Sequence, residues 1–363
     1  MRGYGATVCD EGDYEVFAYD EMDVDELPNC VVNGDIATFK FFTEKPELPY
    51  TVGSCLKAHP HTPQPPDNSN FPGYEFDYNP KSEKNTVRPF QRCLLHPPWP
   101  GKTEAGEVEF KIVDWVQAGD PNDAQVVAIR ILNSTVDLPT DMDILAKIYD
   151  PLYFNHIKDV EMFRYTDYCY RRESAAYKHL ADLQGNIIPK YYGSFTISLP
   201  GDGNISRDVR LILLEIVTGQ SMDKLDPSSF KQAERQEIMK AVVDSERAVY
   251  ARKVINRDIN PRNILLPPKQ RHRDRRAVMV DFGISFIKPD LDDKTYLTGL
   301  ADPPKSFHCI DPYDNFWEWV DWDWDAWINE QYAHIKGSSI TPREESKIYV
   351  DNKRRTGYDS WGS

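Results

Sequence analysis

The sequence lacks several features that would assign it to familiar classes of protein. It has no run of about 18 apolar residues, so we expect no transmembrane helix. Residues 1–27 contain no apolar segment like that of a signal peptide. The six cysteines are scattered, without a C-x-x-C pair, which argues against a zinc site and favours reduced thiols. We therefore expect a cytoplasmic or nuclear protein.

The sequence also lacks an excess of positive charge, because 58 acidic residues outnumber 43 Lys and Arg residues. The net charge is −15, which argues against binding to nucleic acid or to an anionic membrane surface. Hydrophobic residues make up 40% of the chain and aromatic residues 12%, as in an ordered globular protein. With 363 residues, the chain is long enough for a buried core that is divided between two lobes.

The pattern of residues divides the chain into four regions. Residues 1–105 form an N-terminal extension that we expect to be partly disordered, because it is acidic at first and then proline-rich, and it could dock a partner. Residues 106–217 contain five strand-like segments around one helical segment, 161–185, which predicts a mainly antiparallel sheet. Residues 218–335 begin with a long helical pattern, and we expect this region to be mostly helical. Residues 336–363 form a polar tail.

The stretch "NRDINPRN" carries the first candidate chemistry. Asp258 and Asn263 are five positions apart on a loop that Pro261 interrupts. Phosphoryl transfer needs a carboxylate beside the accepting hydroxyl and a metal-bound phosphate chain, and this loop could supply both groups. An ordinary turn is the alternative, since Asp, Asn and Pro are all frequent in turns.

Three further residues strengthen this interpretation. The strand "VMV" ends at Asp281, and a carboxylate there, followed by Gly283, suits a magnesium ligand. Lys147 lies in an apolar strand and needs an anionic partner, for which Glu173 in the long helix is the natural candidate. Each residue alone could belong to a turn or a surface salt bridge. All of them in this order are much more specific.

These motifs give the chain a resemblance to a known family. With "AKIYDPLY", "ESAAYKHLADLQGNIIPKYYGSF", "LLEIVTGQSM" and "INRDINPRNILL", it resembles the protein-kinase-like superfamily, and most of all its divergent fungal members. The resemblance covers roughly residues 106–330. It implies an α+β, two-lobed protein-kinase-like fold, with a small antiparallel-sheet N-lobe that has one main helix and an abbreviated, mostly helical C-lobe. ATP would bind between the lobes.

The resemblance also implies roles for matching positions in binding ATP and magnesium. Lys147 would hold the α- and β-phosphates, and Glu173 would fix Lys147 in place. Asn263 and Asp281 would hold the magnesium ion.

Other roles concern the acceptor and the adenine ring. Asp258 would orient and deprotonate the accepting hydroxyl, and Arg262 would supply positive charge beside it. Backbone groups near Glu215 and Val217 would pair with adenine.

The sequence departs from the family pattern at three places. The expected glycine-rich loop is reduced to Gly119, next to Asp120 and Asp123, which repel phosphate. Asn256 stands where the family has a histidine, and we expect its amide to support the loop by hydrogen bonding. The stretch after Gly283 has no Ala-Pro-Glu motif, so switching by phosphorylation of that stretch is not expected.

Two functions remain open at this point. The first is an ATP- and magnesium-dependent phosphotransferase that transfers the γ-phosphoryl group to a hydroxyl of a protein Ser/Thr residue or of a small alcohol. The second is a pseudokinase that binds ATP or acts as a scaffold without turnover. The weak glycine loop and Asn256 favour the pseudokinase. The complete set of Lys147, Glu173, Asp258, Asn263 and Asp281 favours the enzyme.

Overall fold

The structure is a computed structural model that describes residues 45–66, 78–119, 122–154, 161–200, 205–271, 273–287, 310, 312 and 315–333. The acidic start of the predicted extension, the stretch 288–309 and the predicted polar tail 336–363 lie outside these residues.

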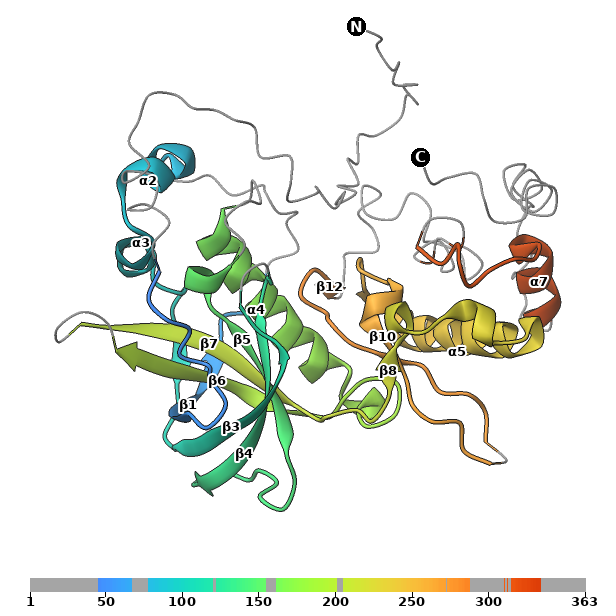
Figure 1. Ribbon diagram of the computed structural model, residues 1–363, viewed down its shortest axis with the longest axis horizontal. Helices are drawn as coiled ribbons and strands as arrows, with labels where there is room; N and C mark the ends of the chain where they lie inside the picture. Colours follow the sequence, from blue (N-terminus) through green and yellow to red (C-terminus); the bar gives the residue numbers. More distant parts are fainter. Residues whose placement is uncertain are drawn as a thin grey trace, which may run out of the picture. The chain divides into compact units, whose positions relative to one another are not determined.

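A closed antiparallel barrel is formed by strands between Cys55 and Leu214 (Figure 1). Six strands follow one another around it: β1 (Cys55–Pro63), β3 (Val108–Gln117), β4 (Gln125–Ser134), β5 (Ile144–Tyr149), β7 (Ser206–Leu214) and β6 (Tyr191–Pro200). The ring closes because β1 pairs with β3 along one edge and with β6 along the other. A short strand, β2 (Gly101–Thr103), pairs with the end of β1.

Alternation of buried and solvent-facing side chains explains why these segments form strands. In β3, the side chains of Val108, Phe110 and Ile112 are fully buried, and the residues between them are not. Successive side chains of a strand point to opposite faces, so such alternation gives each strand one apolar face. These faces meet in a core inside the barrel.

Helices cover the barrel and continue the chain beyond it. Their bounds are α2 (Pro80–Thr86), α3 (Pro89–Leu95), α4 (Met162–His179), α5 (Gln232–Tyr250) and α7 (Trp324–Gln331). The long helix α4 lies along the barrel and contacts β5, β6 and β7 (Figure 1). It begins after Glu161, whose side chain accepts hydrogen bonds from the backbone N–H groups of Phe163 and Arg164 and so caps the helix.

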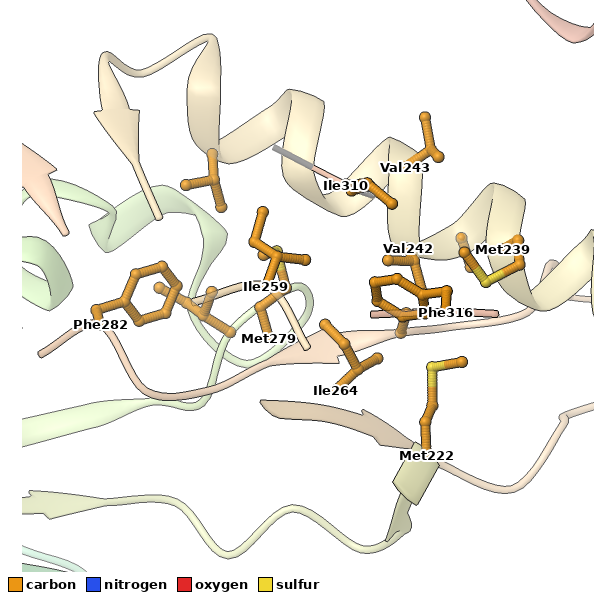
Figure 2. Close-up of a cluster of buried hydrophobic side chains, with 14 of the residues drawn as sticks. Met222, Met239, Val242, Val243, Ile259, Ile264, Met279, Phe282, Ile310 and Phe316 are labelled. Carbon is orange, nitrogen blue, oxygen red and sulfur yellow. The ribbon is translucent and has the colours of Figure 1, made fainter. Parts of the chain in front are cut away.

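The second core lies between α5 and several short strands. These strands are β8 (Gln220–Ser221), β9 (Val254–Ile255), β10 (Ile264–Leu266), β11 (Val278–Met279) and β12 (Phe286–Ile287). Figure 2 shows Met239 and Val242 of α5 near Phe316, with Ile264 and Met279 on the strand side of the cluster. This core supports the loop that precedes β10.

The predicted two-lobed protein-kinase-like fold with a mostly helical C-lobe is wrong. The strands that α4 packs against belong to a closed barrel. The barrel closes because β1 pairs with β6, and in this pairing His59 lies opposite Thr196, 137 positions further along the chain. Within the described part of 218–335, only α5 and α7 are α-helices. The rest consists of irregular chain with the short strands β8 to β12 and three 3₁₀ turns, η3 (Met222–Lys224), η4 (Pro227–Ser229) and η5 (Pro261–Asn263). Two more 3₁₀ turns, η1 (Pro151–Tyr153) and η2 (Ala181–Leu183), flank α4.

The predicted boundaries at residues 105, 217 and 335 stay predictions. The barrel nevertheless includes β1, which lies inside the stretch that we assigned to an N-terminal extension. No helix among the described residues combines the length and the apolar character that crossing a membrane requires.

A proline-rich segment of the same stretch lies against α4. The backbone N–H of Trp99 donates to Asp167 Oδ1 at 3.2 Å, and the Trp99 carbonyl accepts from Arg210 Nη2 at 3.3 Å. The guanidinium groups of Arg164 and Arg171 lie 5.4 and 4.6 Å from the centroids of the Trp99 ring system. The segment therefore holds the outer face of α4 by hydrogen bonds and cation–π contacts.

Asp167 provides a test of this packing. Burial raises the pKa of its carboxyl from 3.8 to about 6, although Arg171 and the Trp99 N–H oppose the rise. The pKa of this carboxyl is higher in the folded protein than in the unfolded chain. Its favourable contribution to the free energy of unfolding is therefore complete below pH 3.8 and is lost as the pH rises through about 6. We expect Asp167→Asn, which cannot ionise, to be more stable than the wild type above pH 7 by about 1–3 kcal/mol. Urea unfolding between pH 4 and 8 measures this difference, and a difference that stays constant with pH contradicts the prediction.

Candidate functional site

Lys147 lies between two carboxylates that come from distant parts of the chain. Its Nζ is 2.7 Å from Glu173 Oε2 on α4 and 2.9 Å from Asp281 Oδ1, which follows β11. The Glu173 side chain is fully buried, whereas 42% of the Asp281 side chain is exposed. The predicted pairing of Lys147 with Glu173 is therefore present, and Asp281 joins it.

The surroundings set the charge of these three groups. Burial alone would lower the pKa of Lys147, but the Asp281 and Glu173 carboxylates outweigh it and raise this pKa above its usual value. Burial raises the pKa of Glu173, and Lys147 opposes that rise. The pKa of Asp281 is lowered, because Lys147 and the Gly283 N–H outweigh the effect of burial. Lys147 thus stays cationic, ready to meet an anion.

The loop between β9 and β10 surrounds the Asp258 carboxylate with donors. Asp258 Oδ1 accepts hydrogen bonds from Arg262 Nη2 at 2.7 Å and from the Asn260 side chain. Asp258 Oδ2 accepts from Asn263 Nδ2 at 2.9 Å. With these donors, the carboxylate is held in one orientation, while 23% of the Asp258 side chain stays exposed.

Backbone pairing joins this loop to the segment that carries Asp281. Strands β10 and β11 are antiparallel neighbours, and the Val280 N–H donates to the Asn263 carbonyl at 2.9 Å. Asn256 Oδ1 accepts from the Asp258 N–H at 3.0 Å, and Asn256 Nδ2 is 3.4 Å from the Asp281 carbonyl. The expectation that Asn256 supports the loop by hydrogen bonding is confirmed. The two candidate motifs therefore form one site.

The backbone at Asp281 is unusual. Its φ is +61°, a left-handed conformation that is rare for a residue with a side chain. Two residues on, a Cβ at Gly283 would lie 3.2 Å from Cys169 Cβ and 3.3 Å from Asp281 Oδ1. Strained conformations of this kind persist where the surroundings enforce them, often at functional sites. A glycine at 283 lets this turn pack closely against α4.

The oxygen donors at this site fit a magnesium ion. Asn263 uses its Nδ2 on Asp258, so its Oδ1 remains as a ligand, and Asp281 uses Oδ1 on Lys147 and Gly283. Carboxylate and amide oxygens are the donors that Mg²⁺ prefers, completed by phosphate oxygens and water. Among the described residues, no group of three or more His, Cys, Asp or Glu side chains is placed to hold a metal ion.

Other predicted residues do not join this cluster. The Glu215 backbone N–H donates to the Lys190 carbonyl at 2.9 Å, and the Glu215 side chain accepts from the Lys190 N–H at 2.9 Å. Glu215 and Val217 lie directly after β7, and their predicted part in adenine binding stays a prediction. The Gly119 N–H donates to the Gln125 side chain, and the Gly119 carbonyl accepts from Asn122 Nδ2 at 2.9 Å, so both backbone groups of this glycine are already used.

Sequence reasoning missed two neighbours of the site. Tyr149 OH donates to Glu173 Oε2 at 2.5 Å, and Asn260 contacts Asp258. A usable signal existed for Tyr149, because a residue two positions from Lys147 on a strand lies on the same face. No comparable signal marked Asn260, whose contact depends on how the loop turns at Pro261.

Comparison with known proteins gives limited support. No family model matches the chain. A stretch of 78 residues is 30% identical to myosin light chain kinase A of Dictyostelium discoideum. The match covers 21% of this chain and 26% of that kinase. This weak, partial similarity hints at a relationship to kinases, and it lends no support to the fungal part of the resemblance.

Proposed function

We propose that the chain is an ATP- and magnesium-dependent phosphotransferase that transfers the γ-phosphoryl group to a hydroxyl. The observation that carries this proposal is the cation of Lys147, held at 2.7 and 2.9 Å between Glu173 and Asp281. The Asp258 loop adjoins this cluster through backbone pairing. The partial similarity to a kinase supports the same proposal. The acceptor would be a protein Ser/Thr residue or a small alcohol.

Each residue has a task that its position allows. Lys147 binds the α- and β-phosphates, and Glu173 holds its ammonium in place. Asp258 accepts the proton of the acceptor hydroxyl, while Arg262, 2.7 Å from Asp258 Oδ1, adds positive charge nearby. Asn263 and Asp281 hold magnesium, which when bound neutralises phosphate charge. Catalysis would come from positioning and charge stabilisation.

An alternative is a protein that binds ATP without turnover. The bond from the Gly119 N–H to the Gln125 side chain favours it, because a backbone N–H that is already used does not bind a phosphate oxygen. The two functions predict the same nucleotide binding but differ in product formation, so binding and turnover need separate measurements.

The first test is nucleotide binding. We expect magnesium-ATP to raise the melting temperature of the wild-type protein, because a ligand that binds only the folded state stabilises it. Lys147→Ala removes the cation that meets the phosphates and should abolish this rise. Lys57→Ala is the control, since Lys57 is an exposed lysine paired with Glu107 on the barrel. The proposal loses its basis if magnesium-ATP leaves the wild-type melting temperature unchanged and calorimetric titration also detects no binding.

A further inference from the structure

Tyr149 and Lys147 meet at one oxygen atom. Tyr149 OH donates to Glu173 Oε2 at 2.5 Å, and Lys147 Nζ donates to the same oxygen at 2.7 Å. Both residues come from β5, two positions apart, so they extend from the same face of the strand. The strand thus presents a hydroxyl and an ammonium together to the one carboxylate of α4 that faces them.

The other oxygen of this carboxylate has no such support. Glu173 Oε1 is buried and has no hydrogen-bond partner among the described residues. A buried carboxylate loses free energy when its hydrogen bonds break. Rotation of the Glu173 carboxylate would break the bonds that Oε2 accepts from Tyr149 and Lys147, so both donors resist it. Tyr149 supplies one of these two donors, and its side chain is almost fully buried.

We propose that Tyr149 is a positioning residue that holds Lys147 in place through Glu173. This inference rests on the proposed function, because it concerns the lysine that would bind the phosphates. Tyr149 would act on the lysine through Glu173. Its hydroxyl fixes Oε2, Oε2 fixes the ammonium, and the ammonium then lies where Asp281 also contacts it.

Tyr170 offers a matched control. It is as buried as Tyr149, and their ring centroids are 5.5 Å apart. The Tyr170 hydroxyl lies 2.7 Å from His61 Nδ1, so it bonds to β1 and not to Glu173. Tyr149→Phe and Tyr170→Phe each delete one buried hydroxyl from the same region, but only Tyr149→Phe removes a bond to the carboxylate.

The test measures Lys147 directly, without nucleotide. An amine-reactive ester is added to the wild type, Tyr149→Phe and Tyr170→Phe, and the acylation rate of Lys147 is followed by peptide mass spectrometry, with Lys57 as the internal reference. Tyr149→Phe should raise the rate several-fold, and Tyr170→Phe should not. Glu173→Gln alone should also raise it, and Tyr149→Phe should add nothing in that background. Equal rates in both Phe variants, or an unchanged rate in Glu173→Gln, would overturn the inference.

A second measurement separates this inference from the proposed function. Calorimetry compares magnesium-ATP with adenosine, which has no phosphates for Lys147 to contact. Tyr149→Phe should lower ATP affinity on the order of tenfold, the usual effect of a lost hydrogen bond to a charged group, and leave adenosine affinity unchanged. Equal losses for both ligands indicate a general structural role and overturn the inference. If the wild type binds neither ligand, the proposed function fails, while the acylation rates still decide what Tyr149 does to Lys147.

Discussion

Replacing Asp258 with asparagine is expected to lower the rate of phosphoryl transfer by a factor of about 10²–10⁴, the usual contribution of a positioned general base. The replacement keeps the size of the side chain and one oxygen that can accept from Asn263. It removes the negative charge that accepts the hydroxyl proton, and it leaves the Arg262 guanidinium without its 2.7 Å ion pair. Nucleotide affinity should change little, because the lysine that meets the phosphates contacts other carboxylates.

The measurement is the transfer of label from γ-labelled ATP to a panel of proteins and small alcohols. Asp274→Asn is the matched control, since Asp274 is exposed on the connection between β10 and β11. The control should transfer label like the wild type. Equal transfer by Asp258→Asn and the wild type would exclude Asp258 as the base. Binding of magnesium-ATP with no transfer by any variant would instead favour the non-catalytic alternative.

The strands of the barrel could be predicted from the sequence because their signal is local. In β5, the buried Ile144, Ala146 and Ile148 alternate with Lys147 and Leu145, which are only partly buried. Closure of the barrel could not be predicted in this way. It depends on β1, a strand with two prolines and two histidines, whose partners lie about 50 and 140 positions away. In the sequence alone, prolines indicate a loop. They are nevertheless tolerated in a strand at positions where no backbone N–H has to donate a hydrogen bond to a neighbouring strand.

One contact of the candidate site was easier to predict than the fold that carries it. Lys147 and Glu173 were paired because a charged residue in a buried strand must find an opposite charge, and this rule does not depend on topology. The contact of Lys147 with Asp281 and the position of Tyr149 depend on how α4 and β11 approach β5, which no local pattern specifies. A pair of opposite charges can therefore be predicted from the sequence while the arrangement of helices around it is not.

The largest stability effect is expected at a buried ion pair near the end of β5. Arg207 donates from Nη1 to Asp150 Oδ1 at 2.6 Å and from Nη2 to Asp150 Oδ2 at 2.8 Å. The Asp150 side chain is fully buried, and Tyr50 OH donates to it as well at 2.6 Å. Burial by itself would lower the pKa of Arg207, but Asp150 outweighs burial and raises it. The pair joins β7 to the chain that leaves β5 and to the segment before β1.

Arg207→Met should therefore lower the free energy of unfolding by about 3–5 kcal/mol, because it leaves a buried carboxylate without its cation. That is a large part of the roughly 5–15 kcal/mol that stabilises a typical domain.

Arg130→Met is the control. Arg130 makes a similar bidentate contact with Asp143, but its side chain is 56% exposed, so the expected loss is below about 1 kcal/mol. Urea unfolding of both variants measures these losses. Similar small losses in the two variants would mean that the buried pair contributes no more than the exposed one, and that apolar packing alone holds β7 against β5.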